Sequence, residues 1–241
     1  MASSSSETVQ GAEGPARCRM LTSIKTERDK IEIVNQLLLP HCTEYIEINT
    51  IEEAHDAIKT MKVNLPCFQE HLSLLTSFWQ IRGAPAIASL AALTFAANLS
   101  KALETSPTPP FLSSPEALQA HVTPILDYLY TARPTAVNLG AATRRIARKF
   151  QSSKDAGKDT IAIARDLVAE ARLVSDEDYS RNMKMATYGG SWLVAFHALS
   201  AAETLNVLTV CNTGSLATSV CGTFHSRFFL MIPATLFSLR E

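Results

Sequence analysis

The sequence of 241 residues lacks a large net charge of either sign, since 22 Lys and Arg side chains against 23 Asp and Glu side chains give a formal charge of -1. This balance gives no support for binding to nucleic acids or to membrane surfaces, which strongly basic surfaces mediate. No run reaches the roughly 20 apolar residues of a membrane span. The polar start MASSSSETVQGAEG lacks the apolar core of a signal peptide. We therefore predict a cytoplasmic protein, with the nucleus as a second compartment.

Paired metal-ligand and disulfide spacings are also missing. The five cysteines show no CxxC spacing, and their odd number argues against a disulfide framework or a zinc site. No two of the six histidines stand four positions apart. We therefore expect no metal cofactor and a reducing environment. The cysteines are Cys18, Cys42, Cys67, Cys211 and Cys221.

Composition and pattern divide the chain into three parts. Residues 1–20 are rich in Ser, Gly and Glu and are predicted to form a disordered tail. Residues 21–204 are predicted to form a mainly helical domain with a small antiparallel sheet. Residues 205–241 are the third part and begin with a predicted strand. The predicted fold class is therefore α+β.

Local patterns predict the individual elements. KIEIV (30–34) and EYIEIN (44–49) alternate apolar and polar residues and predict two strands. TIEEAHDAIKTM (50–61) predicts a helix with Thr50 and Glu53 as a capping box. NVLTV (206–210) predicts a strand, followed by a turn into a helix. Further helices are expected at 86–97, 115–130, 134–151, 157–173 and 176–203, with a Pro- and Ser-rich surface loop at 103–117.

Two charge clusters each allow a structural and a functional interpretation. The triplet Asp176, Glu177 and Asp178 falls in the first turn of the helix predicted at 176–203, where acidic residues suit the helix dipole. Paired catalytic carboxylates are the alternative for this triplet. A basic cluster predicts the solvated face of a helix rather than a nucleic-acid surface; it comprises Arg144, Arg145, Arg148 and Lys149.

The stretch RGAPAIASLAALTF (82–95) combines an arginine with the start of an apolar helix. Pro85 suits the first helical position, where its missing N–H costs nothing. Gly83 and Ala84 have no bulk to keep a ligand away from the free N–H groups of the first turn. Those donors and Arg82 together favour a bound anion. The alternative is that Arg82 reaches solvent beside a core helix.

Similar features recur twice. Arg133 precedes Pro134, which again suits a first helical position, and the turn at 212–215 offers N–H groups to an anionic or polyhydroxy ligand. We therefore predict one phosphorylated ligand held between helix ends. Cys211, at the tip of the strand 206–210, is suited to a lowered thiol pKa and proton-transfer chemistry. The alternative is that it is a small buried hydrophobe.

Taken together, these stretches resemble a known family. MKV…IRGAPAIA, RPTAVNL and LTVCNTGSLATS are similar to the three signature stretches of methylthioribose-1-phosphate isomerases, in the same order. The N-terminal region also resembles that family, and the match runs from Ile81 to about Ser219. The wider superfamily includes the alpha, beta and delta regulatory subunits of the translation-initiation guanine-nucleotide exchange factor, and ribose-1,5-bisphosphate isomerase. The run Cys-Asn-Thr-Gly-Ser-Leu-Ala-Thr favours the methylthioribose enzymes.

The resemblance implies an aldose–ketose isomerase that converts 5-methylthioribose 1-phosphate to 5-methylthioribulose 1-phosphate in methionine salvage. It implies a homodimer without metal or organic cofactor. The resemblance leaves open whether hydrogen moves from C2 to C1 as a proton or as a hydride. By residue-wise carry-over, Cys211 matches the catalytic cysteine, and the substrate-binding positions are Arg82, Gly83, Ala84 and Arg133. A non-catalytic phosphosugar- or nucleotide-binding regulatory subunit is the alternative function.

The chain departs from the family pattern in several places. Residues 64–80 form an atypical apolar insertion, and Val210 replaces the usual histidine before the cysteine. After Ser219 the resemblance fades, where the family continues into a doubly wound α/β domain that carries its catalytic aspartate. We interpret both atypical segments as translated intron sequence. We expect the strand 206–210, the first of that missing domain, to lack ladder partners, and residues 1–241 alone to be an inactive fragment.

Overall fold

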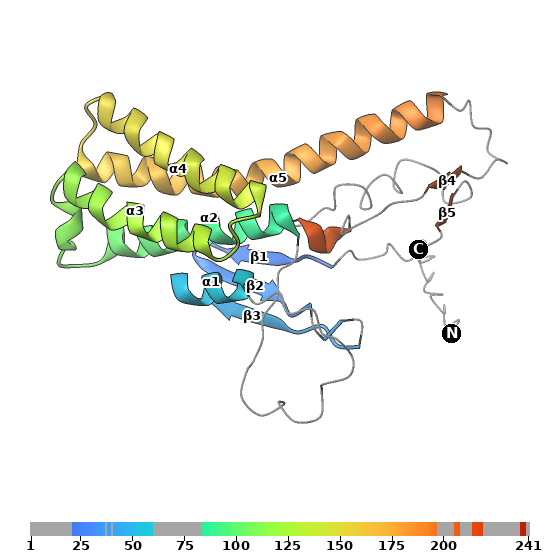
Figure 1. Cartoon of the computed structure of the whole chain (residues 1–241), viewed down its shortest axis with the longest axis horizontal. Helices are drawn as coiled ribbons and strands as arrows, with labels where there is room; N and C mark the ends of the chain where they lie inside the picture. Colours follow the sequence, from blue (N-terminus) through green and yellow to red (C-terminus); the bar gives the residue numbers. More distant parts are fainter. Residues whose placement is uncertain are drawn as a thin grey trace, which may run out of the picture.

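The computed structural model describes residues 21–36, 38–39, 41–59, 83–196, 205–207, 214–218 and 237–239. A small antiparallel sheet lies beside a layer of helices, and a second sheet of two strands lies apart from them (Figure 1). The strands are β1 (Ile24–Glu27), β2 (Lys30–Val34), β3 (Tyr45–Ile48), β4 (Leu205–Val207) and β5 (Phe237–Leu239). The α-helices are α1 (Ile51–Lys59), α2 (Ala84–Glu104), α3 (Pro115–Thr131), α4 (Val137–Asp155) and α5 (Thr160–Phe196). Short 3-10 helices are η1 (Pro110–Leu112) and η2 (Ser215–Ala217).

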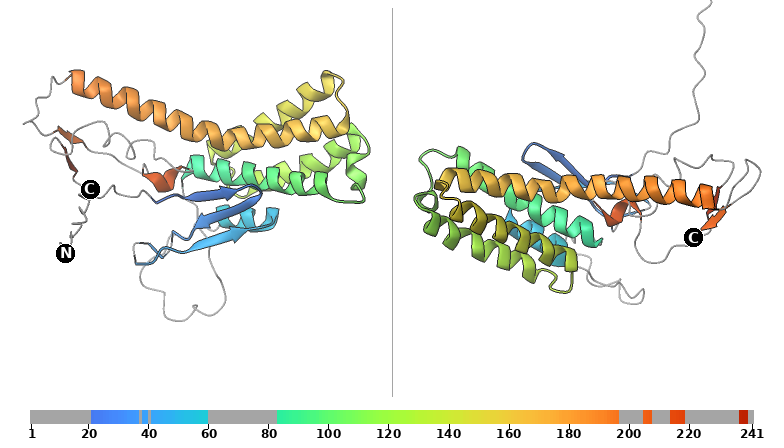
Figure 2. Two further views of the ribbon diagram at one scale, coloured as in Figure 1. Left: turned by 180° about the vertical axis from the view of Figure 1, so that it is seen from behind. Right: turned by 90° about the horizontal axis from the view of Figure 1, so that it is seen from above.

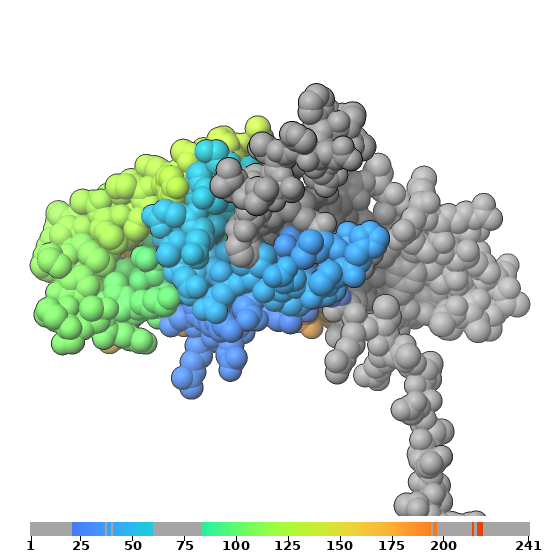
Figure 3. Space-filling view, turned by 90° about the horizontal axis from the view of Figure 1, so that it is seen from below, coloured from blue at the N-terminus to red at the C-terminus, as the bar shows by residue number. Residues whose placement is uncertain are grey.

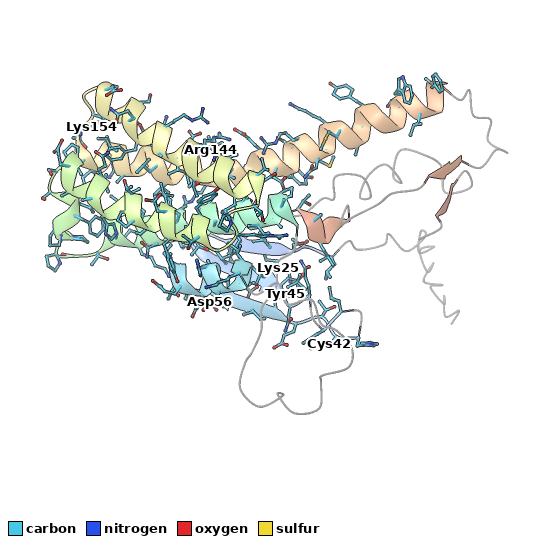
Figure 4. All side chains as sticks on the ribbon, viewed as in Figure 1. Lys25, Cys42, Tyr45, Asp56, Arg144 and Lys154 are labelled. Carbon is cyan, nitrogen blue, oxygen red and sulfur yellow. The ribbon has the colours of Figure 1, made fainter. Side chains whose placement is uncertain are left out.

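The antiparallel sheet confirms the two predicted strands and adds β1, which the sequence patterns missed. Its strand order is β1-β2-β3, with Ile33 opposite both Ile24 and Ile46. These isoleucines are buried on the face that packs into the core. The other face is polar, and there Lys25 lies over the ring of Tyr45 at 3.3 Å from its centroid (Figure 4). The alternation therefore produces one buried and one solvated face.

In the view from below, helix α1 lies beside the strands of the antiparallel sheet (Figure 3), and it packs against α2 and α3. The predicted cap of α1 is present. The Thr50 Oγ1 atom accepts a hydrogen bond from the Glu53 backbone N–H at 3.1 Å. The Glu53 carboxylate accepts from the Thr50 N–H at 3.2 Å in return. This reciprocal pair satisfies donors that the helix start would otherwise leave open.

Helix α2 is the centre of the core. Its residues are buried on nearly every side, and it packs against α1, α4 and α5. The alanines along it allow these neighbours to approach closely. By length and composition alone α2 could cross a membrane, contrary to the expectation that no run is long enough, but 67% of its apolar window is buried inside the fold. The apolar character of α2 therefore has a structural explanation in core packing.

The remaining helices differ from the predicted ones in two places. Pro134 is not at a first helical position, because α4 begins three residues later at Val137 with Ala136 as its N-cap. The two helices predicted at 157–173 and 176–203 are wrong as separate elements, since α5 runs unbroken from Thr160 to Phe196. Helix α5 has no proline to break it, and its first half packs against α2 and α4. Its second half extends beyond the other helices (Figure 2).

The first two residues of the strand predicted at 206–210 lie in β4, and residues 208–210 lie outside the described residues. The expectation that this strand lacks a ladder partner is wrong. Strand β4 pairs in parallel with β5, with Asn206 opposite Ser238. A segment of the atypical tail therefore supplies the partner. The predicted tail at 1–20 and the insertion at 64–80 lie outside the described residues.

Candidate functional site

The helix starts in the described chain fall into two groups. Side chains cap the N-termini of α1, α3 and α5, where Thr50, Ser114 and Asp159 accept from backbone N–H groups. No side chain caps α2 or α4, whose N-cap residues are Gly83 and Ala136. An uncapped first turn presents free N–H donors and the positive end of the helix dipole. Among the described helices with a capping assignment, α2 and α4 are therefore the two whose starts have no side-chain cap.

These two uncapped starts line the same cleft, which has a volume of about 690 Å³. Pro85 lines it from the first turn of α2, and Val137 and Asn138 line it from the first turn of α4. The middle of α5 forms another part of its lining. Ligand pockets for small molecules are typically about 300–1,000 Å³. The other lining residues are Ala88, Ser89, Ala141, Ala142, Arg145, Arg148, Val174, Asp178, Arg181, Asn182, Lys184 and Met185.

Basic side chains dominate the charge of the cleft. Arg145, Arg148, Arg181 and Lys184 line it, against one carboxylate, that of Asp178. Within the described residues, Arg148 and Lys184 form no ion pair, so their charge is available to a ligand. Together with the two helix starts, this lining favours an anion in the cleft.

Arg145 differs from the other basic residues of the cleft. Its Nη1 and Nη2 atoms donate to the two carboxylate oxygens of Glu177 at 2.7 and 2.8 Å, and its Nε atom donates to Glu170. These hydrogen bonds hold the pKa of the Glu177 carboxyl below its ordinary value, although partial desolvation opposes them. They also raise the pKa of the Arg145 guanidinium.

This ion-pair cluster corrects two interpretations of the sequence. The basic cluster is not wholly a solvated face, because Arg145 bridges α4 to two carboxylates of α5. The triplet at 176–178 does not stand in a first turn, because it lies in the middle of α5. Glu177 pairs with Arg145, whereas Asp178 is buried and accepts from the Asn182 side chain at 3.1 Å. Of the triplet, Glu177 thus belongs to an ion pair and Asp178 lines the cleft, whereas Asp176 is exposed.

Part of the motif LTVCNTGSLATS packs against Gly83 at the start of α2. The position of Gly83 leaves no space for a Cβ atom, which would overlap the backbone of Ala217 in η2. The Gln36 side chain also donates to the Leu216 carbonyl at 3.3 Å. The stretch Gly214–Thr218 is therefore held at the N-terminus of α2, although more than 130 residues separate the two in sequence. Glycine at 83 allows this close approach.

Arg133 lies in the turn between α3 and α4, where it is half-buried. Its carbonyl accepts from the Ala136 N–H at 2.9 Å, and this bond shapes the entry into α4. Arg133 is not among the residues that line the cleft. The first turn of α4, which follows it in the chain, does line the cleft. Gly83 is the N-cap of α2 and Ala84 is its first residue, so the prediction that Pro85 takes the first helical position is wrong, and Pro85 is the second. Pro85 lines the cleft, whereas Gly83 and Ala84 are not among its lining residues. Arg82 and Cys211 lie outside the described residues.

Sequence reasoning did not select several residues that line the cleft. Ser89, Asn182 and Lys184 stand outside the motif residues, on α2 and α5. One sequence signal could have identified Ser89 as a lining residue, because it is a polar residue within the apolar run from Ala86 to Ala97. Among the described residues, no cluster of His, Cys, Asp and Glu could hold a metal ion.

Comparison with known proteins places this geometry in a family. The model of the initiation factor 2 subunit family matches residues 80–230, which include IRGAPAIA, RPTAVNL and LTVCNTGSLATS but not the MKV that opens the first motif. The chain belongs to the initiation factor 2 subunit family. Members of this family thus share the region that builds the uncapped helix starts and the cleft.

Curated members at high identity carry the name that the resemblance implied. The methylthioribose-1-phosphate isomerase of Laccaria bicolor is 56% identical over 206 residues, which are 84% of this chain and 49% of the relative. The isomerase of Postia placenta is 57% identical, over 84% of this chain and 48% of the relative. The chain therefore spans about half the length of the curated relatives that it matches.

Solved structures of family members show the same fold. The 5-methylthioribose 1-phosphate isomerase of Pyrococcus horikoshii matches with a TM-score of 0.60 and 28% identity, over 85% of this chain and 47% of that one. The delta subunit of the translation initiation factor eIF-2B from A. fulgidus matches with a TM-score of 0.56 and 29% identity, over 84% and 48% of the two chains. The helical region and its antiparallel sheet are therefore a shared architecture.

Proposed function

We propose that this chain carries the sugar-phosphate-binding part of a methylthioribose-1-phosphate isomerase. The carrying observation is that the two helices without capping side chains line one basic cleft. A phosphate group has the charge and the acceptor oxygens that such helix starts bind. Its substrate would be 5-methylthioribose 1-phosphate, the substrate in the name of its relatives.

The reaction would open the sugar ring and then transfer hydrogen from C2 to C1. The phosphate on C1 prevents spontaneous ring opening, so the enzyme must assist this step. We propose that Arg82, Gly83, Ala84 and Arg133 bind the substrate. Holding the phosphate fixes the position of C1 and C2 relative to the reacting groups, which is a large part of catalysis. Cys211 would then act on the sugar as the catalytic thiol.

A regulatory subunit of a translation-initiation exchange factor is the second candidate. The similarity of the fold to the delta subunit, with a TM-score of 0.56, favours it. Such a subunit would keep the cleft as a binding site without chemistry. The identity of 56–57% to named isomerases favours the enzyme.

Arg133→Ala tests the proposed binding role. We expect the variant of residues 1–241 to bind 5-methylthioribose 1-phosphate about tenfold or more weakly, because a hydrogen bond to a charged group contributes about 1.5–3 kcal/mol. Isothermal titration calorimetry measures this change. Arg144→Ala is the matched control, since Arg144 is exposed and lies outside the cleft lining. Equal affinities of wild type and Arg133→Ala would refute the role of Arg133.

Turnover separates the two candidate functions. To measure turnover, we would build a chimera of the Laccaria bicolor isomerase in which residues 81–218 of this chain replace the matched segment. If the chain is part of an isomerase, we expect the chimera to interconvert the two sugar phosphates and Cys211→Ala to abolish the reaction. A chimera that binds the substrate without turnover would favour the regulatory subunit. Absence of both binding and turnover would overturn the proposed function.

We further propose a cytoplasmic homodimer, with the nucleus as a second compartment. We also propose that residues 21–204 form one domain and that 205–241 begin another. Fluorescent tagging and analytical ultracentrifugation test the first proposal. Limited proteolysis with cleavage near residue 204 tests the second.

A further inference from the structure

Ser89 is an unusual residue in the core helix. It lies on α2, one turn after Pro85, and it lines the cleft. Its side chain is fully buried, and its Oγ atom has no hydrogen-bond partner among the residues that the structure describes. Serines inside helices ordinarily bond to a preceding carbonyl or face solvent. A buried hydroxyl without a partner destabilises the free protein, so its presence in a cleft points to a partner that binds there.

The α5 part of the same cleft is also polar and buried. Asp178 and Asn182 are 5% and 3% exposed, and they stand one helical turn apart. The Asn182 Nδ2 atom donates to Asp178 Oδ1 at 3.1 Å. A carboxylate accepts hydrogen bonds only, whereas an amide and a serine hydroxyl both donate and accept. This combination suits the hydroxyl groups of a ligand, which themselves donate and accept.

We infer that Ser89 and the Asp178–Asn182 pair form a subsite for the sugar hydroxyls of the ligand. The inference rests on the proposed function, in which the helix starts and the basic side chains bind the phosphate. The two groups of residues then recognise different parts of one molecule. Ser89 thereby determines specificity for a sugar phosphate over phosphate alone.

Ser89→Ala in the full chain tests this subsite. Calorimetric titration compares two probes, 5-methylthioribose 1-phosphate and inorganic phosphate. We expect affinity for the sugar phosphate to fall about three- to tenfold, the range for one neutral hydrogen bond, and affinity for phosphate to stay unchanged. The melting temperature should stay the same or rise by about 1–4 °C, because an unpaired buried hydroxyl is removed. Binding and stability would thus change in opposite directions.

Thr94→Val is the matched control. Thr94 is also buried on α2, and its Oγ1 atom also lacks a partner, but it does not line the cleft. Its replacement should affect the melting temperature in the same way and leave both affinities unchanged. Asp178→Asn, which keeps the side-chain shape, should weaken sugar-phosphate binding about tenfold, because a hydroxyl bond to a carboxylate is lost.

The outcomes distinguish this inference from the proposed function. If wild type binds the sugar phosphate and Ser89→Ala binds it equally, the subsite is wrong and the proposed function stands. If Ser89→Ala weakens both probes equally, Ser89 shapes the phosphate site and the inference is again wrong. If wild type does not bind the sugar phosphate, the proposed function fails and the subsite fails with it.

Discussion

The ion-pair cluster of Arg145, Glu170 and Glu177 joins α4 to α5 beside the cleft, and its loss should destabilise the fold. Arg145→Met removes the guanidinium and keeps most of the apolar stem, so the change isolates the charge and its hydrogen bonds. It also leaves two carboxylates of α5 without their shared cation. The perturbation therefore acts on the α4–α5 interface, and it also removes one of the basic side chains that line the cleft.

The expected loss is about 2 kcal/mol. Exposed ion pairs contribute about 0–1 kcal/mol, whereas breaking a buried pair costs about 3–5 kcal/mol. The side chains of Arg145, Glu170 and Glu177 are 27%, 17% and 38% exposed, which places the cluster between these limits. For a chain of this size the melting temperature should fall by about 4–8 °C.

A double-mutant cycle measures the interaction directly. Urea unfolding of wild type, Arg145→Met, Glu177→Gln and the double variant should give a coupling energy of about 1–2 kcal/mol. Arg144→Met is the control, because Arg144 is exposed and forms no ion pair within the described residues. It should change stability by less than about 0.5 kcal/mol. Coupling near zero, with equal effects of the two arginine variants, would refute the stabilising role of the cluster.

The same cluster predicts a pH dependence. Arg145 lowers the pKa of Glu177 in the folded state below its unfolded value of 4.5. Glu177 therefore contributes stability that is fully present above the unfolded pKa and is lost as the pH falls through the folded pKa. Between pH 6 and about pH 3, wild type should lose more stability than Arg145→Met. Parallel curves for the two proteins would contradict this.

Three further changes test the fold around the site. Gly83→Ala should destabilise the protein by about 1–3 kcal/mol, because a Cβ atom overlaps the backbone of Ala217; Gly214→Ala, with open space around it, should have little effect in the same unfolding assay. Thr50→Ala should cost about 1 kcal/mol in thermal unfolding through loss of the α1 cap, and no change would refute that role. Phe95→Ala should cost about 3–5 kcal/mol, because the ring is 2% exposed in the core; a loss under 1 kcal/mol would contradict this packing.

The local elements that the sequence predicted correctly depend on short-range interactions. Alternation predicted β2 and β3, and the spacing of Thr50 and Glu53 predicted the start of α1. The apolar run predicted a buried helix at 86–97, which lies inside α2. Each signal depends on interactions within a few residues of the chain, so it can be recognised without knowing which other elements pack nearby. Strand β1 was missed because Lys25 and Glu27 stand in a short segment with little apolar alternation.

Errors arose where tertiary packing overrides a local signal. The acidic triplet at 176–178 resembles the first turn of a helix. Packing of α5 against α2 and α4, together with the Arg145–Glu177 ion pair, favours a continuous helix through this triplet. Pro134 resembles a first helical residue, but it belongs to the turn that closes with the bond from Ala136 to Arg133. A local sequence pattern carries no information about which side chains of a distant helix will contact the segment.

The sequence by itself determined the family motifs and the residue types suited to a phosphate at a helix start, since Gly83, Ala84 and Pro85 are neighbours along the chain. Only the tertiary structure decided that the starts of α2 and α4 share one cleft and that Ala217 packs on Gly83. It also decided that Ser89 and Asn182 are buried beside the same cleft. These contacts join residues about 50 to 130 positions apart, and the packing of α2 against its neighbours, rather than any local pattern, brings them together.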